Sequence, residues 1–206
     1  MRTAATEAAT SEEELLAGEM PRPALPPART ARAVEIVATA RRLLEDEGPN
    51  AVTMRRIADD MGIQAPSLYK HFSSKAMVEM ALIEDALFDF GEVSHRALHA
   101  PEAATPIVRL LAAYRRYCLA HSNLYRLCTS GQLDRESLPT GLEEWAGNPW
   151  FVVTADSSLA QALWSFAHGM LILEMDERYP PGSDLDQTWQ AGATAFEQSV
   201  KRGSGR

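Results

Sequence analysis

The chain has little cysteine and no long hydrophobic run. Cys118 and Cys128 are the only cysteines among its 206 residues. Cytosolic thiols are normally reduced, so both are interpreted as small core residues. No apolar stretch approaches the ~20 residues that cross a bilayer. The first residues also lack the basic and then apolar order of a signal peptide, and we therefore expect a cytoplasmic protein.

Sequence motifs of common enzyme classes are missing as well. There is no P-loop, GxSxG, GxGxxG or HExxH, and no paired CxxC. Two weaker patterns are present. Glu92, His95 and His99 share one helix face and could ligate a metal, and His121 follows Cys118 by three residues. A solvated polar face explains the first pattern better, so we predict no catalytic residue, no metal and no cofactor.

Charge is distributed unevenly along the chain, whose formal net charge is -8. Residues 28–75 carry eight Lys and Arg against six Asp and Glu, whereas residues 1–27 and 76–206 are both acidic. An acidic protein does not bind polyanions indiscriminately, but a local basic face can still do so. Arg29 and Arg32 in the basic block either reach the backbone of such a partner or are simply solvated.

Apolar residues recur with helical spacing over most of the chain. Between positions 33 and 44 they lie three or four residues apart, which is one stripe of a helix that ends at Gly48. Residues 130–154 are rich in Gly, Pro and Asn and are predicted to be mostly loop or short helix. No strand pattern of useful length is present, so the predicted fold class is all-α. Further helices are predicted at roughly 53–61, 65–72, 74–90, 104–120, 122–129, 156–178 and 184–201.

Residues 53–72 have the spacing of a helix-turn-helix. Gly62 allows the positive φ of a tight turn, and Pro66 falls in the first turn of the second helix, where a missing N–H is harmless. Small residues begin that helix and let it enter a groove. Lys70 and His71 follow and can reach phosphates or base edges.

The segment TMRRIADDMGIQAPSLYKHFSSKAMV at positions 53–78 resembles the DNA-binding signature of the TetR/AcrR family of bacterial regulators. The resemblance covers about residues 30–90. Gln64 stands where the family usually has a Ser or Thr cap, and Pro66 stands where it often has Gly or Arg. These two departures predict a weaker cap and an altered base preference.

The resemblance implies phosphate contacts from Thr53, Tyr69 and Lys75, and a backbone or base contact from Arg55. The alternative for Tyr69 is that its ring packs in the core. For Phe72 we adopt this core interpretation. The predicted DNA-binding residues are Thr53, Arg55, Gln64, Ala65, Pro66, Ser67, Tyr69, Lys70, His71 and Lys75.

The predicted helix at 156–178 is apolar nearly all round, so the domain core should cover one face and a partner chain the other. The family resemblance implies a homodimer held by the last two helices of each protomer. The predicted interface residues are Phe166, Met170, Trp189, Gly192, Ala193 and Phe196.

Trp164, His168 and Gly169 resemble the Trp–His–Gly segment of one C-terminal subgroup of this family. Trp164 and His168 share a helix face. We favour the interpretation that Trp164 packs in the core and His168 is hydrogen-bonded. The alternative is that both line an effector cavity. An apolar, aromatic-lined pocket would suit a hydrophobic small molecule. Its predicted residues are Tyr114, Tyr117, Tyr125, Trp150, Trp164 and His168.

We therefore expect four segments: a tail at 1–27, a helix-turn-helix DNA-binding domain at 28–75, a helical effector-binding and dimerisation domain at 76–201, and a tail at 202–206. The expected function is a ligand-responsive transcriptional repressor that a small hydrophobic effector releases from a palindromic operator in double-stranded DNA. An activator is one alternative. The other is an all-α small-molecule-binding or metal-binding dimer, or an enzyme, without sequence-specific DNA binding.

Overall fold

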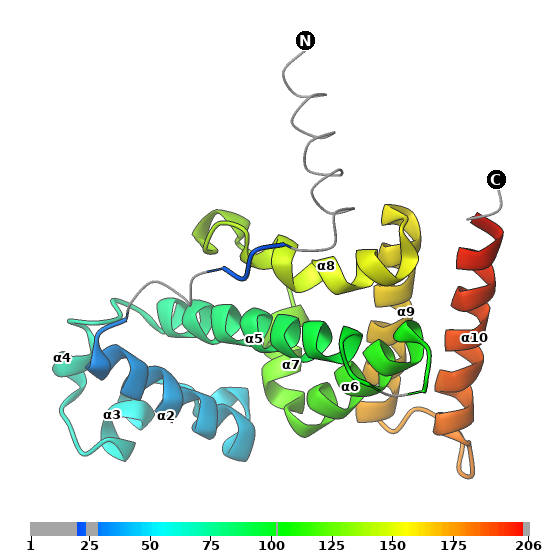
Figure 1. The fold of residues 1–206 in the computed structure, drawn as a ribbon. Coiled ribbons are helices and arrows are strands. Elements are labelled where there is room, and N and C mark those ends of the chain that lie inside the picture. The colour runs from blue at the N-terminus through cyan, green and yellow to red at the C-terminus, as the bar shows by residue number, and fades with distance from the viewer. Residues whose placement is uncertain (1–19, 24–28, 102, 204–206) are drawn as a thin grey trace. The chain divides into compact units, whose positions relative to one another are not determined.

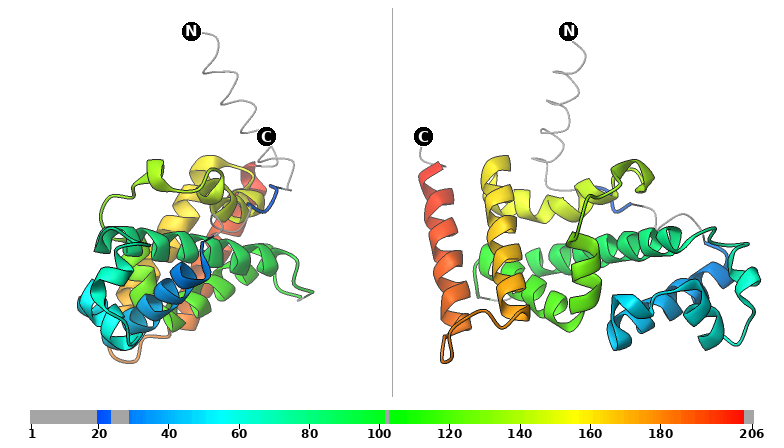
Figure 2. Two further views of the ribbon diagram at one scale, coloured as in Figure 1. Left: turned by 90° about the vertical axis from the view of Figure 1, so that its left-hand side faces the viewer. Right: turned by 180° about the vertical axis from the view of Figure 1, so that it is seen from behind.

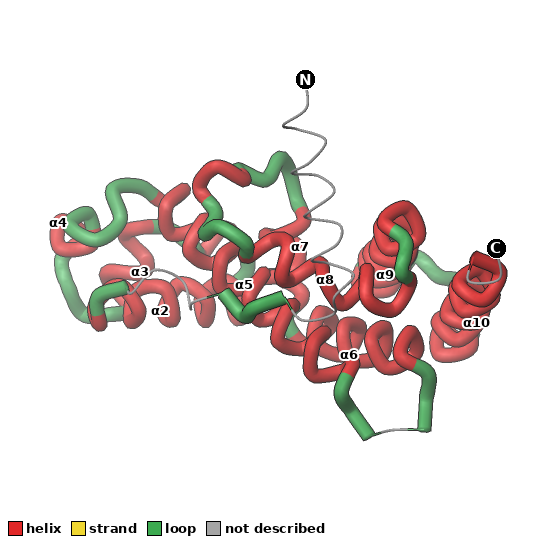
Figure 3. The backbone as a smooth tube through the Cα atoms, turned by 45° about the horizontal axis from the view of Figure 1, so that its top comes forward, coloured by secondary structure: helices red, strands yellow, loops and turns green. Residues whose placement is uncertain are grey.

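A computed structural model describes residues 20–23, 29–101 and 103–203. Every regular element in these ranges is a helix (Figures 1 and 3), which confirms the all-α fold class. No helix in the described ranges is long and apolar enough to span a bilayer. Most of the tail predicted at 1–27 lies outside the described residues. The last helix runs on to Gly203, so the predicted C-terminal tail at 202–206 begins inside it and ends outside the described residues.

The helices in chain order are α2 (Ala31–Glu47), the short 3-10 helix η1 (Pro49–Ala51), α3 (Met54–Asp60), α4 (Ala65–Leu68), α5 (Lys75–Leu98), α6 (Pro106–Ala120), α7 (Ser122–Thr129), η2 (Arg135–Ser137), α8 (Leu142–Thr154), α9 (Ser157–Met175) and α10 (Leu185–Gly203).

The chain forms two compact units. The first, called the α2 unit, contains Pro23–Asp89 and Ala120–Glu143. The second, called the α9 unit, contains residues up to Arg22 together with Phe90–Leu119 and Glu144–Arg206. Helix α5 contributes its first part to the α2 unit and its last part to the α9 unit, so this division falls later in the chain than the boundary expected at 75/76.

The α2 unit is built on the stripe that the sequence predicted. Thr30 caps α2 by accepting a hydrogen bond from the Ala33 N–H at 3.2 Å, and Gly48 ends it with φ 86°. Every apolar position of the stripe is buried, which confirms the inward face. These positions are Ala33, Ile36, Val37, Ala40, Leu43 and Leu44.

The turn between α3 and α4 is closed by backbone hydrogen bonds. Gly62 adopts φ 65°, which favours glycine. The Gly62 N–H donates to the Asp59 carbonyl at 3.2 Å, and the Ile63 N–H donates to the Ala58 carbonyl at 3.0 Å. This pair of bonds satisfies the last carbonyls of α3 in the Schellman arrangement and fixes the direction in which the chain enters α4.

Aromatic side chains dominate the core of the α9 unit. The ring of Tyr114 on α6 meets Trp150 on α8 edge-on at 4.9 Å and Phe90 on α5 at 5.8 Å. Helices α9 and α10 lie side by side in the right-hand view of Figure 2, and their residues are in contact. Gly192 on α10 has no side chain, and a Cβ there would overlap the ring of Phe166 on α9. The close approach of these two helices therefore depends on this glycine.

Residues 130–154 were predicted to be mostly loop or short helix, and helix α8 is longer than this prediction allowed. The Gly-Asn-Pro run at 147–149 suggested a loop, yet Pro149 lies inside a 13-residue helix. Proline has no N–H to donate to the carbonyl four residues earlier, which belongs to Trp145. His95 Nε2 on α5 bonds that carbonyl at 3.0 Å instead. A tertiary contact thus compensates the helix-breaking residue.

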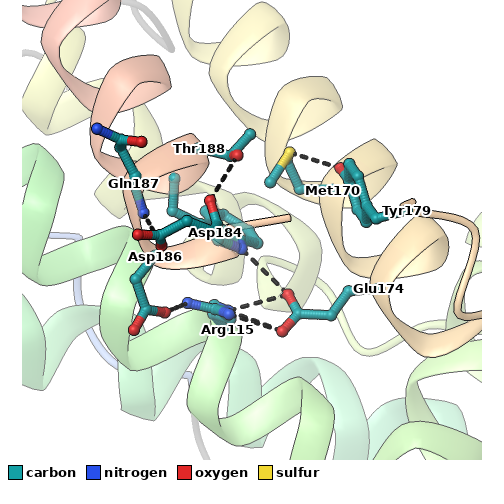
Figure 4. Close-up of polar contacts among 9 residues, drawn as sticks. Arg115, Met170, Glu174, Tyr179, Asp184, Asp186, Gln187 and Thr188 are labelled. Atoms are coloured by element: carbon teal, nitrogen blue, oxygen red, sulfur yellow. Dashed lines mark hydrogen bonds and ion pairs between the residues drawn. The ribbon is translucent and has the colours of Figure 1, made fainter. Parts of the chain in front are cut away.

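The predicted dimer interface also needs a correction, because several of its residues are buried inside one protomer. Trp189 is 6% exposed and Ala193 is 2% exposed. The sulfur of Met170 accepts a hydrogen bond from the Tyr179 hydroxyl at 2.9 Å (Figure 4). Phe166 packs against Trp189 and Phe196, with ring centroids 5.7 Å and 5.8 Å apart. Phe166 therefore contacts α10 within the chain, and Met170 contacts Tyr179 in the segment between the two helices. Phe166, Gly192 and Phe196 are half-buried, so part of their surface remains exposed.

An ion-pair cluster holds Trp189 in this position. Arg115 on α6 lies between Glu174 and Asp186 (Figure 4), at 2.6 Å and 2.5 Å respectively. The Trp189 Nε1–H donates to Glu174 at 3.1 Å, and the Arg115 guanidinium lies 5.4 Å from the Trp189 ring centroid. The indole is therefore bound to its own chain by a hydrogen bond and a cation–π contact.

Candidate nucleic-acid interface

The exposed residues of the helix-turn-helix form a polar face over an apolar base. Leu68 is fully buried and Phe72 is 7% exposed, so both anchor the second helix to the core. The predicted core position of Phe72 is confirmed. Tyr69 is 52% exposed, which excludes its core alternative. Gln64, Pro66, Ser67, Lys70 and His71 are also exposed, whereas Ala65 is half-buried.

Thr53 combines a structural task with an exposed position. Its hydroxyl oxygen accepts a hydrogen bond from the Arg56 N–H at 3.1 Å and so caps α3, as predicted. A hydroxyl that accepts one bond still carries a hydrogen that it can donate. The same side chain can therefore start the helix and donate to a phosphate oxygen.

Helix α4 is shorter than predicted, because it ends at Leu68 rather than Phe72. Gln64 gives no side-chain cap, in agreement with the weak cap that its type predicted. The N–H groups of His71 and Phe72 donate to the Leu68 carbonyl at 2.8 Å and 3.0 Å, so residues 69–71 form a turn. Tyr69, Lys70 and His71 are consequently presented by a turn and not by a regular helix.

The basic residues of this face differ in whether they form ion pairs with nearby carboxylates and in how close those carboxylates lie. Arg55 is 90% exposed and lies 3.8 Å from Asp59. Lys75 lies 3.1 Å from Glu79, one turn later on α5. Lys70 forms no ion pair with the residues that the structure describes. Surface pairs of this kind contribute little to stability, so a phosphate can compete for these cations.

Two other arginines in this unit belong to a network that the sequence reading missed. Arg56 lies 2.6 Å from Glu47, and Arg42 binds Asp60. The hydrogen bond from Arg42 lowers the pKa of the Asp60 carboxyl, and the bond to Glu47 raises the pKa of Arg56. The i,i+4 spacing of Arg56 and Asp60 was the available signal. The network joins the end of α2 to α3.

Arg29 and Arg32 are engaged within the α2 unit. The Arg29 guanidinium donates to Glu84 at 2.6 Å, to Asp85 at 2.7 Å and to the backbone of Ala81, and its side chain is only 14% exposed. The suggestion that Arg29 reaches a partner's backbone is therefore corrected. Arg32 remains exposed and lies 2.7 Å from Glu35.

The predicted effector residues do not form one group. Tyr114 and Trp150 meet in the core of the α9 unit, and Tyr117 joins them through Phe90 at 5.7 Å. Tyr125 is fully buried in the α2 unit instead. Trp164 is 41% exposed, so the core interpretation of this residue is wrong. It stacks on His168 at 5.6 Å on α9, and partial burial lowers the pKa of His168.

The residues of the metal alternative have other partners. His95 bonds the Trp145 carbonyl, and Glu92 lies 2.6 Å from Arg22. No group of three metal-binding side chains occurs among the described residues. Burial raises the pKa of the Cys128 thiol to about 12, so this thiol stays protonated at neutral pH.

A capped helix, a glycine turn and a second helix that ends in an exposed basic turn define a helix-turn-helix DNA-binding protein. Residues 36–78 match the family model described as bacterial regulatory proteins, tetR family. An uncharacterized HTH-type transcriptional regulator of Mycobacterium tuberculosis is 29% identical over 163 residues, 72% of each chain. The tetracycline repressor protein class C of Escherichia coli is 42% identical over 52 residues, which cover 25% of this chain and 24% of the repressor.

Solved structures show the same fold beyond this segment. The TetR family protein ActR of Streptomyces coelicolor, in complex with (S)-DNPA, has a TM-score of 0.59 at 21% identity over 83% of this chain and 97% of that one. A protein of unknown function from Rhodococcus sp. RHA1 has a TM-score of 0.67 at 18% identity over 85% and 98%. The match to the tetR family model thus covers residues 36–78, and the solved structures show that the fold beyond this segment is shared with TetR family proteins such as ActR.

Proposed function

We propose that the chain is a dimeric repressor that binds a palindromic operator through the face around α4 and is released by a small hydrophobic effector. The observation that carries this proposal is the exposed run Tyr69-Lys70-His71, which buried Leu68 and Phe72 hold in place. Such a face on an acidic chain favours one approach to DNA over all others. A cytoplasmic location is part of the proposal.

Within this proposal Thr53, Tyr69 and Lys75 bind phosphates, and Gln64, Ala65, Ser67, Lys70 and His71 face the major groove. Phosphate contacts fix the position of the protein, and base-edge contacts read the sequence. Two-fold symmetry would place the two copies of α4 about one DNA turn apart, ~34–36 Å.

The dimer would form along α9 and α10, through the surface that their own pairing leaves open. Leu173 on α9 is 43% exposed, and Trp164 is 41% exposed. Ala195 on α10 is exposed and small, which suits the close approach of a second helix. These residues replace Trp189, Ala193 and Met170 as the proposed contact.

Release would act through α5, because this helix contributes to both compact units. An effector bound in the α9 unit would shift α5. This shift would change the distance between the two copies of α4 in the dimer. For the effector to release DNA, it must bind more tightly to the conformation whose α4 spacing does not match the operator than to the DNA-binding conformation.

Tyr69→Phe tests the phosphate contact without disturbing the core. Loss of one hydroxyl donor should weaken binding by about tenfold or less, to every DNA sequence alike, because a phosphate contact carries no base information. Fluorescence anisotropy on two unrelated duplexes measures this effect, with Tyr179→Phe in the α9 unit as the matched control. Unchanged affinity for both duplexes would remove Tyr69 from the interface.

A further inference from the structure

A hollow with a volume of about 140 Å³ lies between helices α6 and α10 of the α9 unit. Polar contacts join the two helices at both of its ends. Arg115 near the end of α6 pairs with Asp186 at the start of α10 (Figure 4). The Thr105 hydroxyl, just before α6, donates a hydrogen bond to Glu197 in the second half of α10. The two helices therefore run in opposite directions, and the hollow lies between their contacts.

This hollow, called the α6–α10 groove, lies at the surface and not in the aromatic core. Its α6 wall is one stripe of that helix, formed by Val108, Leu111, Ala112 and Arg115. At about 100° per residue, Tyr114 of the aromatic core lies roughly a third of a turn away from this stripe. On α10 the lining residues repeat the same spacing, from Asp186 to Ala193. The groove is therefore separate from the core cluster around Tyr114.

Small side chains on both helices keep the middle of the groove open. Ala112 on α6 and Ala193 on α10 line it, and a longer side chain at either position would fill it. Its other apolar walls are Val108, Leu111 and Trp189. Apolar cavities of about 150 Å³ bind molecules of the size of benzene. The groove therefore has the volume and the lining for one aromatic ring.

Arg115 gives the groove a cationic end with one replaceable partner. Its Nε and Nη2 atoms donate to Glu174 at 2.9 Å and 2.6 Å, whereas Nη1 donates to Asp186 (Figure 4). The Glu174 side chain is 14% exposed, but that of Asp186 is 88% exposed. An ion pair with so exposed a carboxylate contributes little stability. A carboxylate bound in the groove can therefore replace Asp186, and Arg115 then keeps two carboxylate partners.

We propose that the α6–α10 groove binds a small aromatic monocarboxylate, whose ring fills the hollow beside Trp189 and whose carboxylate binds Arg115 in place of Asp186. A planar guanidinium matches a carboxylate in shape and charge, and an indole in the wall favours contact with another ring. A cationic ligand would be repelled by Arg115, and a neutral one would leave the ion pair with Asp186 in place. This inference does not rest on the proposed function, since the site lies within one protomer and away from α4.

The first test compares benzoate with benzamide, which has nearly the same size and shape but no charge. At equal concentration and equal ionic strength, benzoate should raise the Tm of the wild-type protein more than benzamide does. Equal shifts from both probes, or no shift from either, would overturn the proposal.

The second test fills the groove. Ala112→Leu places a larger side chain in the hollow and should abolish the Tm shift that benzoate causes. Ala191→Leu is the matched control, because Ala191 is exposed on α10 and does not line the groove. That variant should keep the full shift. If Ala112→Leu also keeps it, benzoate binds elsewhere and the proposal is wrong.

The third test removes the carboxylate that the ligand replaces. Asp186→Asn should strengthen benzoate binding by about two- to fivefold in calorimetric titration, because the ligand no longer competes with an ion pair. Asp184→Asn removes the same charge beside α10. Because asparagine still caps the Gln187 N–H that Asp184 binds, this control should leave the affinity nearly unchanged. Unchanged or weaker binding in Asp186→Asn would overturn the proposed exchange. All three tests are made without DNA, so their outcome is independent of the proposed function.

Discussion

The two compact units differ in where they keep their polar groups. The buried Ser, Asn and Thr side chains of the described residues, which are Ser94, Asn148 and Thr154, all belong to the α9 unit. In the α2 unit the polar residues lie outside, as caps, ion pairs and the exposed turn at 69–71. The exposed turn at 69–71 is anchored by the buried side chains of Leu68 and Phe72, and a surface proposed to contact DNA needs such an anchor.

The largest loss of stability should come from truncating the buried side chain of Leu68, which anchors α4 to the core. Leu68→Ala removes a fully buried side chain and should cost about 2–5 kcal/mol of unfolding free energy. Denaturant unfolding measures this loss. Ser67→Ala, an exposed change on the same helix, should leave stability nearly unchanged. Similar losses in both variants would show that α4 has no apolar base.

Gly91→Ala examines the α9 unit in the same way. The added Cβ overlaps the Trp145 ring, which is buried and stacked on His95 at 4.9 Å, so we expect a loss of about 1–3 kcal/mol. Gly147→Ala on α8 is the control, because a Cβ there meets nothing within 4 Å. That variant should be neutral or stabilised by up to about 1 kcal/mol. Thermal unfolding that ranks the two variants in the opposite order would contradict the packing described.

Thr53→Asp separates the cap from the DNA contact. Aspartate caps a helix as well as threonine does, so the stability of the α2 unit should be retained. Its carboxylate would repel phosphates and should weaken DNA binding by about tenfold or more. Thr53→Ser should retain both properties. Unchanged DNA affinity in Thr53→Asp would place the start of α3 away from the DNA.

The smallest effect should come from the Arg42–Asp60–Arg56–Glu47 network. Asp60 is the acceptor of Arg42, and this hydrogen bond lowers its pKa below the ordinary value of 3.8. A carboxyl with a lowered folded pKa stabilises the fold above that ordinary value and loses this contribution as pH falls through the folded pKa. Asp60→Asn should therefore lower Tm slightly at neutral pH, and the difference should vanish in acid. Asp46→Asn, at a carboxylate 3.7 Å from Arg42, should have a smaller effect.

The sequence predicted the α2 unit better than the α9 unit for a physical reason. The helix-turn-helix is specified by local signals: Thr53 caps, Gly62 turns, and Leu68 and Phe72 anchor. In the α9 unit, helix formation and burial depend on contacts between residues that are far apart in the sequence. Pro149 suggested a loop because its compensation comes from His95, more than fifty residues away. Trp189 suggested a dimer contact because an apolar stripe does not reveal whether its own chain or a partner covers it.

The finer features of the candidate site were also out of reach of pattern reading. The end of α4 at Leu68 depends on how the chain turns at Tyr69. The binding of Arg29 to Glu84 and Asp85 depends on the packing of its segment against α5. The α6–α10 groove can be recognised only when both of its helices have positions.

Sequence-specific binding to DNA is the central claim, and selection of genomic fragments by the purified protein tests it most directly. The account predicts enrichment of a palindromic site whose half-sites lie about one helical turn apart, and loss of that enrichment in Tyr69→Phe combined with Lys70→Ala. A protein that enriches no sequence above its input would contradict the account.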